Sequence, residues 1–188
     1  MELKRLPGTM LALPKDKTTN AFSVIEPVLD ATGGLTLRQV CDMTGLPAST
    51  IQNWVKRGWV ANPDGKRYGR RQLARILLIN MMKDAMQLER IVTLMAYING
   101  SVEDERDDII PDWRLYSMLC HILKETEGAA LFSGTEVQDT VQRVAGGYHC
   151  PSSEAQKKLE NTLTVMTWAT LGADCRRKSE QIYQTIQT

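Results

Sequence analysis

The sequence predicts a mainly α-helical protein, in which a winged helix-turn-helix with a short β-wing precedes a helical C-terminal region. Three observations support this fold class. Two short amphipathic segments flank Gly45 and Pro47, a turn-rich segment leads into a run of basic residues, and apolar residues recur at helical spacing along most of the remaining chain. With 188 residues, 43% of them apolar, the chain can bury a sizeable core.

Composition divides the chain into four segments. Residues 1–28 are rich in proline and polar residues, and we expect an N-terminal arm that is partly disordered. Residues 29–100 are expected to form the winged helix-turn-helix domain. Residues 101–112 carry six acidic side chains and one arginine, which predicts an acidic linker. Residues 113–188 are expected to form a helical C-terminal domain for dimerisation or effector binding.

Several protein classes are disfavoured by the same composition. No apolar run reaches the roughly 18 residues that a membrane span requires. The first residues, with Pro7 and Gly8, do not resemble a signal peptide. Four scattered cysteines do not make a disulfide scaffold, so a reducing compartment is the simpler interpretation. We therefore expect a cytoplasmic protein with no membrane partner.

The first helix of the predicted pair is bounded by recognisable signals. Thr36 can act as an N-cap, and Gln39, three residues later, completes a capping box. Gly45 suits the left-handed residue that ends a short helix, and Pro47 suits the start of the next one. Between these signals, one face carries the apolar residues Leu37, Val40 and Cys41.

The second helix of the pair is expected from about Ala48 to Arg57. Its inward face carries apolar residues at helical spacing, namely Ile51, Trp54 and Val55. Its outer face carries candidate DNA-reading residues, namely Ser49, Thr50, Gln52, Asn53 and Lys56. Gln and Asn can bond adenine through two hydrogen bonds, and the other three types can reach bases or phosphates. An ordinary helical hairpin with a polar outer face is the alternative.

Residues 58–68 predict the wing. An apolar pair, Trp59-Val60, is followed by the turn Pro63-Asp64-Gly65 and a basic-aromatic return, as in a two-stranded ribbon. A wing that lies along a DNA backbone needs cations, because phosphate contacts supply affinity and fix the register. The candidates for this role are Lys66, Arg67, Tyr68, Arg70 and Arg71, and Arg75 belongs to the same basic run. A charged, solvated turn is the alternative.

At these residues the sequence resembles the winged helix-turn-helix of MerR-type transcription regulators. The shared features are the Gly45-Leu46 turn, the wing entry Gly58-Trp59-Val60 and the wing exit 66–70. It is most similar to an uncharacterised bacterial group with a MerR-like domain. The resemblance covers a third to a half of the chain. It departs from the family pattern at Ser49 and Asn53, where Arg and Tyr are common, and at the C-terminal part, which shows no MerR effector domain.

Further helices are expected over 71–86, 88–98, 113–127 and 153–187. The methionines of the first two are more typical of core filling than of a cofactor pocket. The last helix repeats apolar residues at a spacing between three and four, which fits either a coiled contact between two copies or packing within the chain. These residues are Leu159, Leu163, Met166, Ala169 or Thr170, and Ala173.

No motif predicts catalysis, and we expect neither an enzyme nor a cofactor. Two Cys-His pairs, Cys120-His121 and His149-Cys150, form the only zinc complement. Their spacing matches no common zinc finger, and adjacent helical side chains diverge by about 100°, so no metal is expected there.

The net charge of +1 hides an asymmetry along the chain. Residues 29–100 hold ten basic and five acidic side chains, whereas residues 101–188 hold nine basic and fourteen acidic ones. This split indicates that one half meets a polyanion. We therefore expect a homodimeric, sequence-specific transcription regulator that binds double-stranded DNA, with an unknown small-molecule or protein effector. An architectural, excisionase-like DNA binder and a protein-interaction module without DNA binding are the alternatives.

Overall fold

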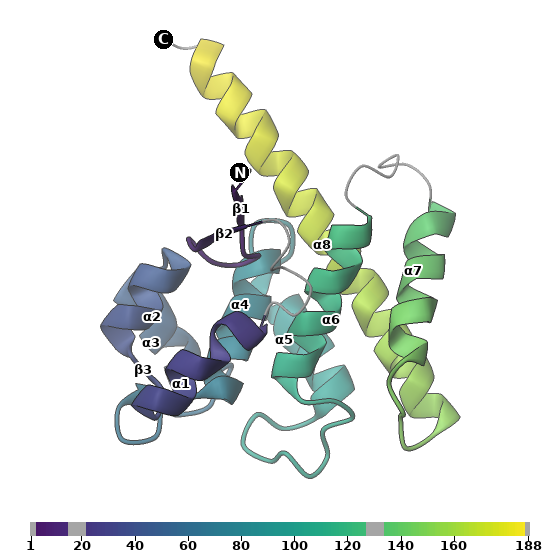
Figure 1. Cartoon of the computed structure of the whole chain (residues 1–188), viewed down its shortest axis with the longest axis horizontal. Coiled ribbons are helices and arrows are strands. Elements are labelled where there is room, and N and C mark those ends of the chain that lie inside the picture. Colours follow the sequence, from purple (N-terminus) through teal and green to yellow (C-terminus); the bar gives the residue numbers. More distant parts are fainter. Residues whose placement is uncertain (1–2, 15–21, 127–133, 187–188) are drawn as a thin grey trace.

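The structure, a computed structural model, describes residues 3–14, 22–126 and 134–186 (Figure 1). The prediction of a mainly α-helical protein is confirmed. The helices are α1 Glu26–Thr32, α2 Leu37–Thr44, α3 Ala48–Lys56, α4 Arg70–Met82, α5 Leu88–Asn99, α6 Asp112–Glu125, α7 Gly134–Gly146 and α8 Ser153–Ile186. Two short antiparallel strand pairs join β1 (Leu3–Arg5) to β2 (Ala12–Pro14) and β3 (Leu35–Thr36) to β4 (Arg67–Tyr68). Within the described ranges, no helix is both long and apolar enough to cross a membrane.

Helix α4 occupies the centre of the molecule. It contacts α2 on one side and α5, α6 and α8 on the other (Figure 1). Apolar side chains are buried around nearly its whole circumference, as the sequence predicts for residues 71–86, although the helix ends at Met82. One continuous core therefore includes residues from both proposed domains. The boundaries at residues 28, 100 and 112 remain a prediction about folding units.

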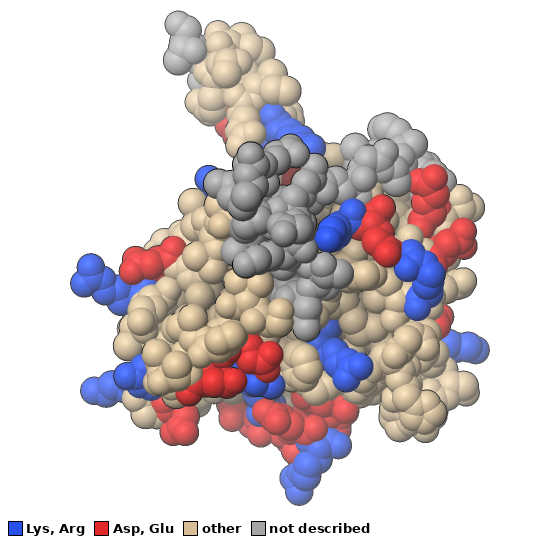
Figure 2. Space-filling view, viewed as in Figure 1, with Lys and Arg blue, Asp and Glu red and all other residues tan. Residues whose placement is uncertain are grey.

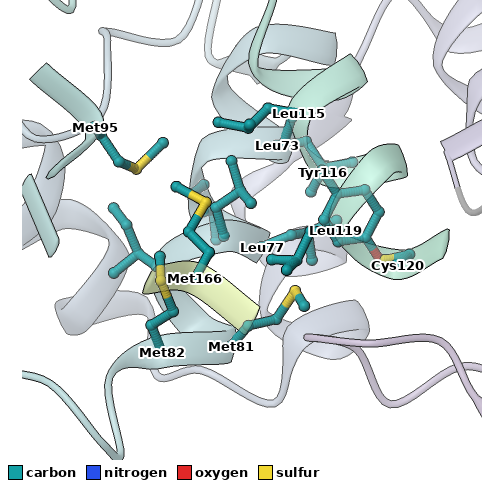
Figure 3. Close-up of a cluster of buried hydrophobic side chains, with 14 of the residues drawn as sticks. Leu73, Leu77, Met81, Met82, Met95, Leu115, Tyr116, Leu119, Cys120 and Met166 are labelled. Carbon is teal, nitrogen blue, oxygen red and sulfur yellow. The ribbon is translucent and has the colours of Figure 1, made fainter. Parts of the chain in front are cut away.

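The methionines of this region fill the core. Met81 and Met82 of α4, Met95 of α5 and Met166 of α8 are all at most 2% exposed. Figure 3 shows their flexible thioether chains among Leu73, Leu77 and Leu119. This packing agrees with the ordinary use of methionine as a filler of irregular gaps.

The N-terminal segment forms a docked β-hairpin over residues 3–14, where the sequence suggested only an arm. Its turn is anchored at three points. The backbone amide of Met10 donates to the carbonyl of Met43 (2.7 Å), and the Tyr116 hydroxyl donates to the carbonyl of Pro7 (2.7 Å). The Asn80 side chain donates to the carbonyl of Gly8 (2.9 Å). These partners are distant in sequence, which is why local patterns did not indicate the hairpin.

Helix α7 is absent from the sequence prediction, which expected helices over 113–127 and 153–187 and none between them. Glycines at its ends, Gly134 and Gly146, obscured a stripe at four-residue spacing. That stripe is buried, with Val137 at 5% exposure and Val141 and Ala145 fully buried. It packs α7 against α6 and α8.

Helix α8 has two apolar faces with different surroundings. The face that the sequence singled out, from Leu159 to Ala173, is buried within the chain, so its spacing reflects intramolecular packing. Beyond Ala173 the helix leaves the body (Figure 1), and residues 175–186 are exposed. The opposite face carries five large exposed apolar residues, namely Val165, Trp168, Ile182, Tyr183 and Ile186.

A buried ion pair joins α4 to the start of α6. Arg75 NH1 lies 3.0 Å from Asp112 Oδ2, and both side chains are at most 3% exposed. Asn99, at the end of α5, donates to Asp112 Oδ1 (2.9 Å) and to the carbonyl of Ile110 (2.7 Å). Arg75 Nε donates to the carbonyl of Trp59, just after α3 (3.1 Å). One network thus connects α4, the start of α6, the end of α5 and the segment after α3. Because Asp112 is buried in this network, the acidic segment 101–112 is not fully solvated.

Asp108 lies beside this network. Partial burial, followed by the negative charge of Asp112, raises the pKa of Asp108 to about 7, although Arg71 and Arg75 oppose the shift. At neutral pH this carboxyl is therefore close to half protonated. Because the folded chain holds the proton more tightly than the unfolded chain does, the charged form of Asp108 opposes folding.

We predict that Asp112→Ala lowers the free energy of unfolding by about 3–5 kcal/mol, because it leaves the Arg75 guanidinium buried without its counter-charge. The double variant Arg75→Met/Asp112→Leu should lose much less, since an apolar pair carries no desolvation cost. Urea unfolding followed by circular dichroism measures both. The exposed pair of Asp104 with Arg106 supplies the control Asp104→Ala, which should leave the urea midpoint nearly unchanged. Equal losses in Asp112→Ala and the double variant would contradict this account.

Asp108→Asn should raise stability at pH 8 and leave it nearly unchanged at pH 4. The pKa of Asp108 is raised in the folded state, so the parent chain loses stability as pH rises from about 4 to about 7, and the variant lacks this loss. Solvent screening reduces the expected gain to about 1 kcal/mol. Urea midpoints at the two pH values measure it, with Glu103→Gln as the exposed control in the same segment. A gain of equal size at both pH values would show that the raised pKa is not its cause.

Candidate nucleic-acid interface

The predicted helix pair is present as α2 and α3, with the expected capping residues. The Thr36 hydroxyl accepts from the amide of Gln39, and the Gln39 side chain accepts from the amide of Thr36 (2.8 Å). Gly45 ends α2 in the left-handed region at φ +73°, and its amide donates to the carbonyl of Cys41 (2.8 Å). Pro47 directly precedes α3. The short connection fixes how α3 is presented beside α2.

Helix α3 separates its apolar residues from its polar ones. Ile51 and Trp54 are at most 1% exposed and anchor the helix to the core. The exposed side chains Ser49, Gln52, Asn53 and Lys56 follow the spacing i, i+3, i+4 and i+7, so they share one face. Thr50 is half-buried at the edge of this face. No acidic residue occurs in α3.

The predicted ribbon between residues 58–61 and 66–68 does not form as expected. The amides of Trp59 and Val60 both donate to the carbonyl of Trp54 at the end of α3, so they are not available to a strand partner. The return strand β4 pairs instead with β3, in the register Leu35 to Tyr68. A side chain at Gly34, where φ is +103°, would collide with the Tyr68 carbonyl, so the pairing requires glycine there.

The tip of the wing segment is a tight two-residue turn. Gly65 and Lys66 both have positive φ, +50° and +64°, and the amide of Arg67 donates to the carbonyl of Asp64 (2.7 Å). Positive φ at both central positions is typical of the type I′ hairpin turn. Lys66 is exposed at this tip. Arg67 is also exposed, and its guanidinium donates to the carbonyl of Gly34 (2.9 Å).

Tyr68 lies inside the molecule, although the sequence placed it among the phosphate-contacting residues. It is 4% exposed, and burial raises the pKa of its hydroxyl. In this position the ring supports the β3–β4 pair, and the hydroxyl is not presented to a ligand.

The arginines at the start of α4 are held by acidic side chains. Arg70 pairs with Glu26 of α1, lies 3.7 Å from Asp30, and stacks over the Trp113 ring at 5.4 Å. Arg71 NH1 lies 3.0 Å from Glu105 Oε1. Including Arg75 in a surface basic run was wrong, because its side chain is buried and paired with Asp112. Local patterns did not reveal this pairing, since Asp112 lies 37 residues further along the chain.

Two exposed cations of the helix pair and its C-terminal flank were not among the predicted site residues. Arg38 lies in the first turn of α2. Arg57 directly follows α3, lies over the Trp59 ring at 4.8 Å, and has Glu89 at 3.6 Å. The Lys56-Arg57 pair at the end of the predicted second helix was the sequence signal for Arg57. Arg38 had no such signal, because it stands alone among uncharged residues.

In each Cys-His pair the cysteine and the histidine differ in how deeply they are buried. Cys120 is 3% exposed in the core, whereas His121 Nε2 lies 3.2 Å from Glu125 Oε1 at the surface. His149 is exposed and Cys150 half-buried, in the segment between α7 and α8. Across residues 3–14, 22–126 and 134–186, no three potential metal-ligating side chains gather as a candidate site.

Comparison with known proteins gives a family without an assigned role. Residues 24–119, about half of the chain, match the family described as "Domain of unknown function (DUF1836)". The "Uncharacterized protein YkrK" of Bacillus subtilis (strain 168) is 29% identical over 91 residues, which cover 46% of this chain and 39% of that relative. The chain thus spans about two fifths of the relative's length. No solved structure matches it.

These matches correct the family prediction. The family that matches is DUF1836 and not the MerR-type regulators, so the assignment to the MerR-type family, made from the turn at Gly45 and the wing residues, was wrong. Short signals such as a capped helix pair and a basic turn recur in unrelated proteins and specify local structure only. The matched region runs from α1 into α6 and contains every candidate DNA-binding residue named above, whereas the Cys-His pairs lie outside it. The chain belongs to the DUF1836 family.

Proposed function

We propose that this protein is a sequence-specific DNA-binding transcription regulator that uses α2 and α3 as a helix-turn-helix. The exposed polar face of α3 is the observation that carries the proposal. Its four side chains share one face of a helix whose other face is anchored by Ile51 and Trp54. A rigid helix with Gln, Asn, Ser and Lys on one side matches the donor and acceptor pattern of the major groove.

In this proposal the short wing supplies phosphate contacts. Lys66 stands at the tip of the turn, and the described residues show no ion pair to it. Arg67 is exposed beside it, and further exposed cations are Arg38 in the first turn of α2 and Arg57 directly after α3. Such contacts orient a protein on DNA without reading sequence.

A protein-interaction module without DNA binding is the second candidate. The pairing of Arg70 and Arg71 with acidic side chains favours it, because those arginines are then already neutralised. The two candidates differ in salt dependence. Only DNA binding through phosphates weakens steeply as salt is raised.

We also propose that two copies act together. Helix-turn-helix proteins commonly read two half-sites related by symmetry. The outward face of α8 supports this, because five of its large apolar side chains are exposed along a helix that extends beyond the body. Exposed apolar surface of this kind is typical of contact sites.

For the DNA proposal, the target sequence is first selected from random duplexes, and binding is then measured by fluorescence anisotropy. Gln52→Ala/Asn53→Ala should weaken binding to the selected duplex by about 1–3 kcal/mol per lost base contact, with little change on unrelated duplex. Lys66→Ala should weaken both and reduce the slope of log K against log salt by about 1.

Lys157→Ala is the matched control for Lys66→Ala, because Lys157 is an exposed lysine near the start of α8, outside the projecting part of that helix. It removes the same charge and should leave the salt slope unchanged. The proposal fails if the parent chain shows no salt-dependent binding, or if the α3 variant binds every duplex as the parent does.

For the dimer, light scattering after size-exclusion chromatography should give twice the mass of one chain. Ile182→Ser/Ile186→Ser should shift the mass toward that of a monomer, because it removes the largest apolar surface of the projecting helix. Val28→Ser, at an exposed apolar position of α1, is the control. A parent chain that runs as a monomer at the concentrations used for DNA binding would contradict the dimer.

A further inference from the structure

Acidic side chains flank the start of α4 on both sides. Figure 2 shows acidic residues gathered along the lower edge of this face, in the region of α1 and of the loop that joins α5 to α6. From α1, Glu26 and Asp30 reach Arg70. From the loop, Glu105 Oε1 lies 3.0 Å from Arg71 NH1. These carboxylates occupy the positions beside the two guanidinium groups that phosphate oxygens would take.

We propose that these contacts form an acidic mask, defined by Glu26, Asp30 and Glu105, which lowers the affinity of the protein for duplex DNA by competing with phosphates for Arg70 and Arg71. The inference rests on the proposed function, and it adds an intramolecular competitor for the phosphate contacts. It also accounts for the pairing of Arg70 and Arg71 with carboxylates in the structure, although the sequence predicted that both arginines contact phosphates.

The geometry allows the mask to open. The Glu105 side chain is 63% exposed and belongs to a loop, whereas Arg71 is 24% exposed and belongs to a central helix. An exposed ion pair of this kind is weak, so phosphates can replace the carboxylate. Arg71 itself remains in place when this happens, because α4 is packed against α6 and α8. Glu105 in the loop thus controls the affinity for duplex DNA, and Arg71 in α4 provides the phosphate-binding group.

Salt dependence identifies the mechanism. While Arg71 stays paired with Glu105, it neutralises no phosphate and adds nothing to the salt slope. When Glu105 is neutral, Arg71 is free to neutralise one more phosphate, and the DNA releases the counterions of that phosphate. The slope of log K against log salt should then increase in magnitude by about 0.9.

The experiment compares Glu105→Gln with Glu103→Gln in the full chain, using anisotropy of a labelled random duplex over a range of salt concentrations. Both variants remove one negative charge from the same loop. The structure gives Glu103 an exposed side chain and, within the described residues, no ion pair. Glu105→Gln should bind about two- to fivefold more tightly than Glu103→Gln at low salt and show the steeper slope.

A double-mutant cycle with Arg71→Ala separates the mask from a general charge effect. In the Arg71→Ala background, Glu105→Gln should behave as Glu103→Gln does, because the masked group is gone. If the parent chain binds DNA and the two glutamine variants are indistinguishable, the mask is wrong and the proposed function stands. If neither the parent nor any variant binds duplex DNA, both are overturned. Binding that appears only in Glu105→Gln would support both.

Discussion

The buried contact between Arg75 and Asp112 determines how the parts of this protein fit together. A buried charge is tolerated only with a partner, and these two groups come from helices on opposite sides of an acidic loop. Through Asn99 and the carbonyl of Trp59 the same network reaches the end of α5 and the segment after α3. The polar face of α3 is therefore positioned by a contact made in the C-terminal half. One nitrogen of Arg75 has no partner within the described residues, which is consistent with a role in specifying geometry more than in adding stability.

Local signals predicted the parts of the fold that are local in origin. The capping box at Thr36 and the left-handed Gly45 act within a few residues, so α2 and α3 could be placed from sequence. The pairing of the wing could not be placed from sequence. The amides of Trp59 and Val60 donate to the end of α3, and the return strand β4 pairs with Leu35 of β3 instead. The docked N-terminal hairpin could not be placed either, because its partners Asn80 and Tyr116 are far along the chain. The polar face of α3 was correctly anticipated as exposed, whereas the burial of Tyr68 depended on tertiary packing.

The charge asymmetry along the sequence takes a different form in space. Acidic residues of the C-terminal half, Glu105 and Asp112, meet Arg71 and Arg75 from the basic half. The excess of five positive charges in residues 29–100 is thus partly neutralised by residues outside that segment. A charge count by segment assumes that each segment faces solvent with its own charges, and a shared core violates this assumption. The charge split alone is therefore a weaker argument for a polyanion than the uncharged and basic face of α3.

This redistribution of charge limits how the protein could hold DNA. With Arg70 and Arg71 paired and Arg75 buried, the exposed cations of α2, α3 and the wing tip reduce to a few, among them Arg38, Lys56 and Lys66. Because non-specific affinity increases with the number of phosphates neutralised, one copy with so few contacts would bind any duplex weakly under the proposed function. Discrimination between sequences would then depend on base contacts from α3, and useful affinity would depend on joining two such surfaces. The outward apolar face of α8 is the described surface best suited to join them, so the C-terminal half would govern DNA binding twice: through the acidic loop, and through the contact between copies.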